Sequence, residues 1–405
     1  MEKIINQTHS KETFLYALSR TLERASFYGL RSLIVLYMVG EILQMENVEA
    51  LKIYGWFTAS FLFSKIIGAI LGDLIIGNKK AVIIGGIIQA LGAFSFCIPS
   101  TTGLYIGLFL VVLGGGLYAP NIISNFGKLY LNKTKLLDAG FTMFYLAVNL
   151  GAFFGVISIG YLGERYGWNI GFIIVGVLML LSIIPIIFSK DKKNEQATEN
   201  KIKVNQRIIN IIIAFVIVSL FWSIYEIGNI RIFDLQLKLS EISRLDVPKN
   251  MWYSFYSVLL FPISILAIIA WTFFYNNQFC KLTIGFIFGA ISFGILFLIP
   301  EMLTEKYAIV YLLSLLFLSI SEIHIAPIIY SILTKNSNPK YLAILISLAF
   351  IPTRLFSMLF SLFNEKFYDN SILPLKFGLI AMIMISIGLI IFVKWKKKNH
   401  LQQHL

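Results

Sequence analysis

Charged side chains lie inside an apolar stretch near the start of the chain. Arg20, Arg24 and Arg31 share helical spacing with Phe27, so all four belong to one stripe of a helix that runs straight into the apolar residues 32–39. A charge against lipid costs roughly 2.5–3.5 kcal/mol on insertion scales. The stripe is therefore expected to face protein or a water-filled path, where guanidinium groups bind carboxylates. The alternative is structural: arginines that reach the helix end, together with one ion pair.

Neutral hydrogen-bonding groups occur in a later apolar stretch. Tyr145 and Asn149 are four residues apart, so a hydroxyl and an amide point the same way from one helix. These groups suit the backbone of a peptide-like solute in a dry site. A hydrogen bond between helices is the competing interpretation.

Two carboxylates lie within the second half of the chain. Glu226 interrupts one apolar run, and Glu322 lies about midway along another, at 307–333. A lone carboxylate inside a membrane needs a partner or a proton, and such residues mark transport paths. We therefore predict that both bind a cation or carry protons. Arg354 is a further intramembrane charge that can pair with either of them.

The composition identifies the class of protein that must position these groups. The chain has 405 residues, of which 58% are hydrophobic and 14% charged, and its mean hydropathy is +0.79. Apolar runs of about 20 residues recur between short polar breaks, as in helical membrane proteins. The net charge of +13 gathers in alternate loops and the tail, which indicates membrane topology rather than nucleic-acid binding. Cys97 and Cys280 lie in or beside apolar runs, so no disulfide framework is expected.

Twelve membrane spans are predicted, in two lobes of six. Residues 1–189 form the first lobe, 190–206 a charged cytoplasmic linker, and 207–405 the second lobe with a basic tail. Lys and Arg dominate the linker, the tail and alternate loops, which predicts that both termini are cytoplasmic. The expected spans are 14–40, 51–76, 80–98, 103–130, 137–161, 168–188, 208–233, 251–275, 282–299, 307–333, 341–362 and 372–394.

The loop after the second span resembles a known motif. Gly68, Gly72 and Asp73, followed by Gly77 and Lys79-Lys80, are similar to the cytoplasmic loop of the major facilitator superfamily. Glycines allow helices to approach closely and turn sharply. Asp73 is expected to receive a helix N-terminus or an arginine and to act as a conformational latch, without contacting substrate.

Further motifs resemble the proton-dependent oligopeptide transporter family. They occur in that family's order and span nearly the whole chain: Glu23-Arg24-x-x-Phe27-Tyr28-Gly29-x-Arg31, Phe144-Tyr145-x-x-Val148-Asn149-x-Gly151, Phe221-Trp222-x-x-Tyr225-Glu226 and Ser321-Glu322 with Pro327. The resemblance implies a major facilitator fold and proton-driven uptake of di- and tripeptides.

The resemblance also implies roles for single residues. The family's arginine at Arg31 holds the peptide carboxylate, its glutamate at Glu322 holds the amine, and its tyrosine and asparagine at Tyr145 and Asn149 bind the backbone. The expected substrate-binding residues are Arg24, Tyr28, Arg31, Tyr145, Asn149, Trp222 and Glu322, and the expected proton-coupling residues are Glu23, Glu226 and Glu322.

The chain departs from the family pattern at three positions. Arg20 replaces the first glutamate of the first-helix motif, Ala119 replaces a lysine before Pro120, and Ile227 replaces a glutamine. The glutamate and the lysine belong to the family's proton-coupling machinery. The joint change keeps the local charge coherent, because an acid becomes a base while a nearby base disappears.

The sequence therefore predicts a bacterial inner-membrane transporter that imports short peptides or similar zwitterions by alternating access. It is expected to be a monomer that uses protons and no cofactor, metal or nucleic acid. One alternative is a transporter of the same fold with another solute and altered or absent proton coupling. Another is a non-transporting membrane sensor. No metal-ligand spacing, nucleophile elbow or phosphate loop suggests an enzyme.

Overall fold

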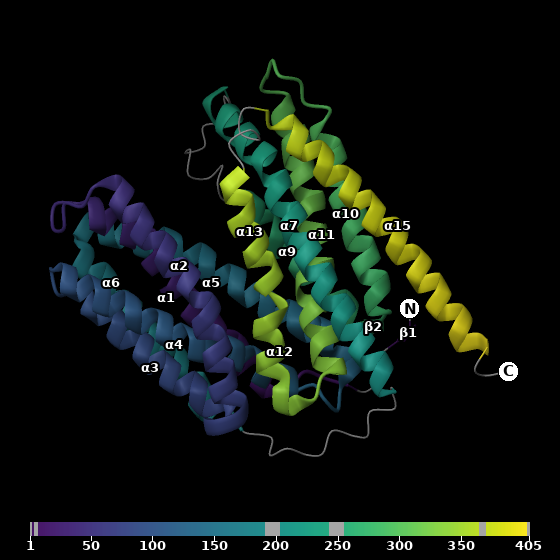
Figure 1. Ribbon diagram of the computed structural model, residues 1–405, viewed down its shortest axis with the longest axis horizontal. Helices are drawn as coiled ribbons and strands as arrows, with labels where there is room; N and C mark the ends of the chain where they lie inside the picture. The colour runs from purple at the N-terminus through teal and green to yellow at the C-terminus, as the bar shows by residue number, and fades with distance from the viewer. Residues whose placement is uncertain (1, 4–6, 191–202, 243–254, 364–369, 403–405) are drawn as a thin grey trace. The chain divides into compact units, whose positions relative to one another are not determined.

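The protein is almost entirely helical (Figure 1). The computed structural model describes residues 2–3, 7–190, 203–242, 255–363 and 370–402. Most of the predicted linker, 190–206, lies outside the described residues. The elements are β1 (Glu2–Lys3), α1 (Lys11–Val39), α2 (Asn47–Leu71), the π-helix η1 (Gly72–Ile76), α3 (Asn78–Ser95), α4 (Thr101–Lys128), the 3-10 turn η2 (Thr134–Leu136), α5 (Leu137–Tyr166), α6 (Trp168–Phe188), α7 (Val204–Ile242), α9 (Phe255–Phe273), β2 (Phe274–Tyr275), α10 (Gln278–Leu296), α11 (Tyr307–Asn336), the 3-10 turn η3 (Pro339–Tyr341), α12 (Leu342–Ala349), α13 (Ile351–Phe363) and α15 (Ile372–Gln402).

The chain divides into two compact units. Residues 7–211 and 333–348 form the unit that we call N-terminal, and residues 1–6, 212–332 and 349–405 form the C-terminal unit. Helices α1–α6 all belong to the N-terminal unit. The predicted lobe boundaries at 189 and 207 stay a prediction.

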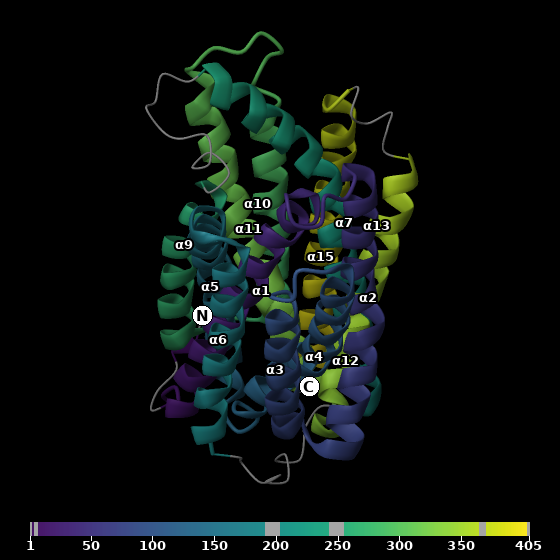
Figure 2. The same ribbon diagram turned by 90° about the vertical axis from the view of Figure 1, so that its left-hand side faces the viewer.

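Small residues set the packing of the N-terminal unit. A Cβ atom on Gly151 would lie 2.2 Å from the backbone oxygen of Thr21, and one on Gly155 would lie 2.2 Å from that of Ala25. Helices α1 and α5 therefore touch backbone to backbone, which only glycine permits. Helix α3 packs in the same way against α4, and its other neighbour is α6 (Figure 2).

The Asp73 loop makes the contact that its motif predicts. Asp73 Oδ1 accepts a hydrogen bond from Asn78 at 2.8 Å, and its Oδ2 accepts one from the backbone N–H of Ile344 at 3.0 Å. Ile344 lies in the first turn of α12, where backbone N–H groups lack helical partners. Asp73 thus receives a helix N-terminus, and the predicted contact is confirmed.

One predicted span is a broken helix, and the C-terminal unit contains a small sheet. The predicted span 341–362 is two helices, α12 and α13, which separate at Phe350. Pro352 lies in the first turn of α13, where its missing backbone N–H costs no helical hydrogen bond. Strands β1 and β2 pair antiparallel, with Glu2 opposite Tyr275, a feature that the sequence did not predict.

Helix α7 continues well beyond the apolar residues of its predicted span. Its last turns carry Arg231, which is 3% exposed and donates to Asp234 Oδ2 at 2.8 Å. Ser371, at the start of α15, donates to the same oxygen at 2.8 Å. These polar bonds stabilise the part of the helix that lies beyond residue 233, where the predicted apolar span ends.

Each predicted span corresponds to a helix or, for 341–362, to a broken pair. Within the described residues, ten helical segments are long and apolar enough to cross a membrane. The other two predicted spans are α1 and α3. Helix α1 contains too many charged residues to be counted as a membrane span by its composition. Helix α3 begins with the polar residues Asn78, Lys79 and Lys80, which lower its mean hydropathy.

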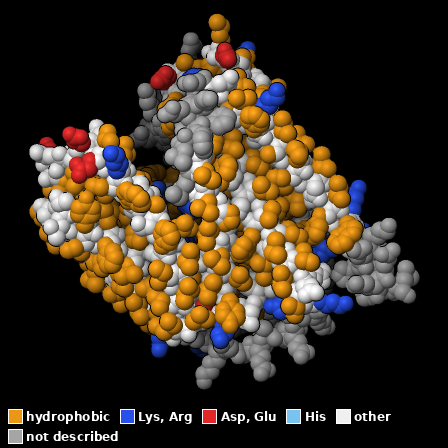
Figure 3. All heavy atoms as spheres, in the orientation of Figure 1, with side chains coloured by type: hydrophobic (Ala, Val, Ile, Leu, Met, Phe, Trp, Pro, Cys, Tyr) orange, Lys and Arg blue, Asp and Glu red, His pale blue; other side chains and the backbone are white. Residues whose placement is uncertain are grey.

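Apolar side chains cover the outside of the helices, as expected for a protein in lipid. Phe63 is 68% exposed and Ile391 is 63% exposed, and hydrophobic atoms cover much of the face in Figure 3, while charged side chains gather mainly near helix ends. Exposed apolar area on this scale marks a membrane surface. The protein is a multi-pass membrane protein with an all-α fold.

The close approach of α1 and α5 gives a first prediction. Gly155→Ala places a methyl group against the rigid backbone of Ala25, so it should lower the unfolding free energy by about 1–3 kcal/mol. The measurement is the thermal unfolding midpoint in detergent. Gly55→Ala is the matched control, because a Cβ atom there has no neighbour within 4 Å. Equal midpoints for the two variants would contradict the packing argument.

Candidate functional site

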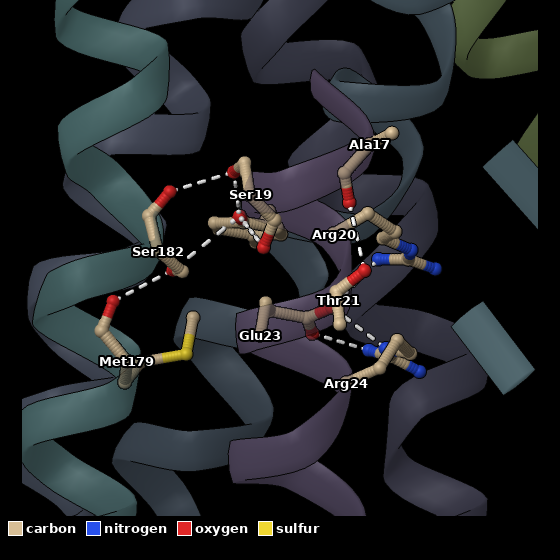
Figure 4. A network of polar contacts seen from close by, with 9 residues as sticks. Ala17, Ser19, Arg20, Thr21, Glu23, Arg24, Met179 and Ser182 are labelled. Atoms are coloured by element: carbon tan, nitrogen blue, oxygen red, sulfur yellow. Dashed lines mark hydrogen bonds and ion pairs between the residues drawn. The ribbon is translucent and has the colours of Figure 1, made fainter. Parts of the chain in front are cut away.

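Two arginines hold the carboxylate of Glu23 (Figure 4). Arg20 Nη1 lies 2.9 Å from Glu23 Oε2, and Arg24 donates to both oxygens of Glu23, with Nε at 2.6 Å from Oε2. The side chain of Glu23 is 0% exposed, and those of Arg20 and Arg24 are 7% and 12% exposed. Bidentate pairing of this kind is the strongest that a carboxylate makes with an arginine. The structural ion pair that the sequence left open is therefore present.

The same helix turn has a second polar side. Ser19 Oγ lies 2.7 Å from the Tyr118 hydroxyl and donates to the backbone oxygen of Ser182 on α6 at 2.6 Å. In Figure 4 the guanidinium groups of Arg20 and Arg24 point away from Ser182. Helix α1 thus anchors one face to α6 and presents its cations on another.

Arg31 has a different environment from that of Arg24. Its Nε donates to the Tyr54 hydroxyl on α2 at 2.7 Å. Its guanidinium lies 5.5–5.9 Å from the ring centres of Phe27, Tyr28 and Tyr54. Among the residues that the structure describes, no carboxylate pairs with Arg31. Aromatic faces and one hydroxyl partly compensate its charge and leave it able to bind an anion.

The predicted pair on α5 lies near this cluster. Asn149 Nδ2 donates to the backbone oxygen of Tyr145 at 2.9 Å, within its own helix. Gly151, two residues further on, lies against Thr21 and the Cβ atom of Arg24. The α5 segment that carries Asn149 therefore packs on the α1 segment that carries the arginines.

The glycine-rich segment of α4 serves packing. Gly116 lies against the backbone of Ser64, and Gly114 lies against the backbone of Gly85. Helix α4 continues through Pro120, and Ala119 is 6% exposed. Asn121 Nδ2 donates to Leu117 O at 2.7 Å and to Gly68 O at 2.8 Å, which joins α4 to α2.

Glu322 lies beside a cavity in the C-terminal unit. It is 4% exposed and accepts a hydrogen bond from the Tyr256 hydroxyl, to which Tyr225 is also hydrogen-bonded. The adjoining cavity of about 180 Å³ is lined by Tyr225, Asn229, Ile232, Gln236, Tyr256, Tyr311, Leu315 and Leu318. This volume is below the ~300 Å³ at which complete ligand pockets begin. The cavity suits one end of a small solute.

Glu226 has a hydroxyl partner. Ser357 Oγ on α13 donates to Glu226 Oε2 at 2.5 Å. Arg354 lies one turn earlier on α13, and among the described residues it forms an ion pair with neither Glu226 nor Glu322. Trp222 is half-buried and packs edge-on against Tyr225, so it lies next to the cavity lining.

The two groups of predicted site residues belong to different units. Arg24, Arg31 and Tyr28 cluster on α1, while Glu322 and Trp222 gather around Tyr225. The clamp between Arg31 and Glu322 stays a prediction. Within the described residues, no three His, Cys, Asp or Glu side chains are grouped so that they hold a metal ion.

Comparison with known proteins identifies the family. The model of the Major Facilitator Superfamily matches residues 16–361. The chain belongs to this superfamily. Its fold is therefore the major facilitator fold, as the sequence predicted.

The curated proteins that the chain resembles include some named as peptide transporters. The chain is 28% identical over 210 residues to dipeptide and tripeptide permease A of Pectobacterium carotovorum, covering 51% of this chain and 41% of the relative. It is 34% identical over 174 residues to peptide transporter YePEPT of Yersinia enterocolitica, covering 41% of this chain and 34% of the relative. The chain thus spans less than half the length of the curated relatives that it matches.

Solved structures match nearly the whole chain. A crystal structure of a peptide transporter POT with sulfate has a TM-score of 0.62 and 22% identity, and covers 97% of this chain and 96% of that one. A POT family transporter with 5-aminolevulinic acid has a TM-score of 0.64 and 19% identity, and covers 94% of this chain and 96% of that one. The predicted resemblance to the oligopeptide transporters is confirmed.

The structure gives a physical reason for one departure from the family pattern. Arg20, which stands where the family has a glutamate, pairs directly with Glu23. Ala119, which stands where the family has a lysine, is buried and apolar. The cation next to the first-helix acid therefore lies on α1 itself in this superfamily member, and the local charge balance survives without a lysine on α4.

The sequence analysis did not predict several residues that lie at these sites. Lys65 on α2 acts electrostatically on Glu23 and lies 5.9 Å from the Phe61 ring centre. The rule for charges inside apolar runs that singled out Arg24 applies equally to Lys65. Tyr54, Tyr256 and Ser357 carry no charge, so nothing in the sequence distinguishes them from other helical hydroxyls.

The Glu23 network gives a second prediction. Glu23→Gln leaves two buried guanidinium groups without their shared carboxylate, so it should lower the unfolding free energy by about 3–5 kcal/mol. Adding Arg20→Gln removes one of those charges, so the double variant should be more stable than Glu23→Gln alone.

Thermal unfolding in detergent measures both effects. Glu164→Gln is the control, since Glu164 is exposed on α5. The network does not act as one unit if Glu23→Gln is as stable as the wild type. The same holds if the double variant loses as much unfolding free energy as Glu23→Gln and Arg20→Gln lose when added together.

Proposed function

We propose that this protein is a secondary active transporter, not an enzyme, that imports di- and tripeptides or similar zwitterions by alternating access and is coupled to protons. One observation carries the proposal. Arg31 lies half-buried among aromatic rings, and its described polar partner is the Tyr54 hydroxyl. Burying a cation in this way is costly unless an anion binds it, and a peptide carboxylate is the matching planar partner.

The C-terminal unit supports the other half of the proposal. Glu322 lies beside a cavity lined by tyrosine hydroxyls and the amides of Asn229 and Gln236. Hydroxyls and amides solvate both an ammonium group and a peptide bond. The curated relatives named as peptide transporters agree with this assignment.

We propose that the protein resides in a bacterial cytoplasmic membrane with both termini in the cytoplasm. The positive-inside rule supports this orientation, because Lys79-Lys80 and the tail lysines fall on one side of the predicted topology. The substrate and the surrounding lipid are then its partners, and the protein acts as a monomer.

Charge reversal tests the substrate site. Arg31→Glu and Glu322→Lys should each reduce uptake of labelled Ala-Ala into proteoliposomes to background, because each replaces an attraction to one peptide terminus by a repulsion. Arg165→Glu and Glu301→Lys are the matched controls at exposed positions. Normal uptake by either site variant, with wild-type folding in detergent, would refute the role of that residue.

Glu226 is the carboxylate best suited to carry the coupling proton. Its described partner is the neutral Ser357 hydroxyl, whereas two guanidinium groups hold Glu23 as a carboxylate. A carboxyl group that must gain and lose a proton is not served by two permanent cations. Glu226→Gln should therefore abolish accumulation of Ala-Ala driven by a pH gradient and leave counterflow exchange at more than half of the wild-type rate.

Two outcomes would oppose this role of Glu226. Accumulation by Glu226→Gln at the wild-type level would place the proton elsewhere, and loss of both accumulation and exchange would make Glu226 a substrate or structural residue. Glu241→Gln, exposed near the end of α7, is the control.

The Arg20–Glu23 pair favours a second candidate, a transporter of the same fold without proton coupling. Arg20 stands where the family's coupling machinery has an acidic residue, and the arginine side chain stays positively charged at every physiological pH. This candidate predicts peptide exchange that is identical with and without an imposed pH gradient.

A further inference from the structure

Packing fixes the ring of Tyr54 beside Arg31. Phe57 and Phe61 follow Tyr54 by three and seven residues, so all three lie on one face of α2. The ring centres of Tyr54 and Phe57 are 6.2 Å apart, and those of Phe57 and Phe61 are 5.3 Å apart. Phe61 in turn packs edge-on against Phe27 of α1 at 5.3 Å. This row of rings holds Tyr54 against the helix that carries Arg31.

The contact between the two residues uses one particular nitrogen of Arg31. Its Nε donates to the Tyr54 hydroxyl at 2.7 Å. A guanidinium group binds a carboxylate with two N–H groups, either through Nε and one Nη or through both Nη groups. The Tyr54 hydroxyl already occupies Nε, so the first arrangement is taken. The edge formed by Nη1 and Nη2 is therefore the one that can bind both oxygens of a substrate carboxylate.

Aromatic rings surround the same guanidinium group. Its central carbon lies 5.9 Å from the Phe27 ring centre, 5.7 Å from that of Tyr28 and 5.5 Å from that of Tyr54. Rings at this distance attract the cation and take up space around it. This attraction depends little on how the guanidinium plane is turned, whereas a hydrogen bond is directional. The bond to Tyr54 therefore decides which edge of Arg31 meets the substrate.

We propose that Tyr54 is a positioning residue for the substrate carboxylate, because its hydroxyl orients Arg31 so that Nη1 and Nη2 bind both carboxylate oxygens. The proposal rests on the proposed peptide transport and adds a specificity-determining residue to its carboxylate site. Tyr54 acts through Arg31 and makes no contact of its own with the substrate. The site then discriminates a peptide with a free carboxylate from its amide, which has neither the second oxygen nor the negative charge.

Ala-Ala and its C-terminal amide measure this discrimination, because they differ only at the carboxylate. Proteoliposomes loaded with unlabelled Ala-Ala take up labelled Ala-Ala in the presence of either compound. The amide ratio is the concentration of the amide that half-inhibits uptake, divided by that of Ala-Ala. Tyr54→Phe keeps the ring and removes the hydroxyl, so it should lower the amide ratio about fivefold, the effect of about 1 kcal/mol at the ion pair.

Controls separate positioning from a general loss of structure. A general weakening of the site affects both compounds and leaves the amide ratio unchanged. Tyr161→Phe is the matched control, because Tyr161 is exposed on α5 and its ring centre lies 5.9 Å from the guanidinium of Arg165. Arg31→Lys keeps the positive charge and lacks Nε, so adding Tyr54→Phe to it should not lower the amide ratio further. For variants too slow for exchange, the ratio is read from the rise in thermal unfolding midpoint that each compound causes in detergent.

The outcomes separate this proposal from the proposed function. If labelled Ala-Ala exchanges and Tyr54→Phe keeps the wild-type amide ratio, the positioning role is wrong and peptide transport stands. A further fall of the ratio in the double variant means that the hydroxyl contacts the substrate itself, which also overturns the positioning role. An equal fall for Tyr161→Phe has the same consequence. If Ala-Ala neither exchanges nor competes, both the proposed function and this proposal fail.

Discussion

Buried charge on α1 is the constraint on which the rest of the site depends. A helix that crosses the bilayer with Arg20, Glu23, Arg24 and Arg31 in its middle is stable only if each charge finds a partner away from lipid. Glu23 gives two of the arginines a partner. The Tyr54 hydroxyl and three aromatic rings, that of Tyr54 included, partly compensate the third. The helices around α1 are arranged so that these partners reach it.

Glycine supplies that arrangement. Gly151 and Gly155 bring the backbone of α5 against α1, and Gly68 brings α2 against Gly116 of α4. Helices that approach this closely leave little freedom in the rotation of α1. Its anchoring face, with Ser19, turns toward α6, and its cations must then occupy another face. The charge pattern and the glycine pattern are thus two parts of one packing solution.

Two carboxylates of the C-terminal unit accept hydrogen bonds from neutral hydroxyl groups. Hydroxyls of Tyr256 and Ser357 donate to Glu322 and Glu226. A hydroxyl bonds to a carboxylate and, by rotating, to a carboxylic acid, so it tolerates both protonation states. Guanidinium groups, which bond to Glu23, favour only the ionised state. Glu23 is thus held in its ionised state, whereas the hydroxyl beside Glu226 accommodates a change of protonation state.

The sequence alone determined the membrane class, the approximate positions of the twelve predicted spans within the described residues, and the superfamily. The bilayer imposes the length of the apolar runs, which can be counted in the sequence. The Asp73 loop is a local motif, and its contact with a helix N-terminus was correctly predicted. Charges inside apolar runs also identified Arg20, Glu23, Arg24, Arg31, Glu226 and Glu322 as the residues that need partners. These properties belong to single segments, so they can be read without knowing which segments meet.

Only the tertiary structure decided which partner each charge has. The sequence left open whether Arg354 pairs with Glu226, and the structure gives Glu226 the Ser357 hydroxyl instead. Tyr54 and Tyr256 became visible as site residues only once α1, α2, α9 and α11 were placed. A hydroxyl in an apolar helix carries no signal of its own, because its role depends on the charge that another helix brings within about 3 Å. Partner choice is a property of helix rotation and packing, and these depend on contacts between residues that are distant in the chain.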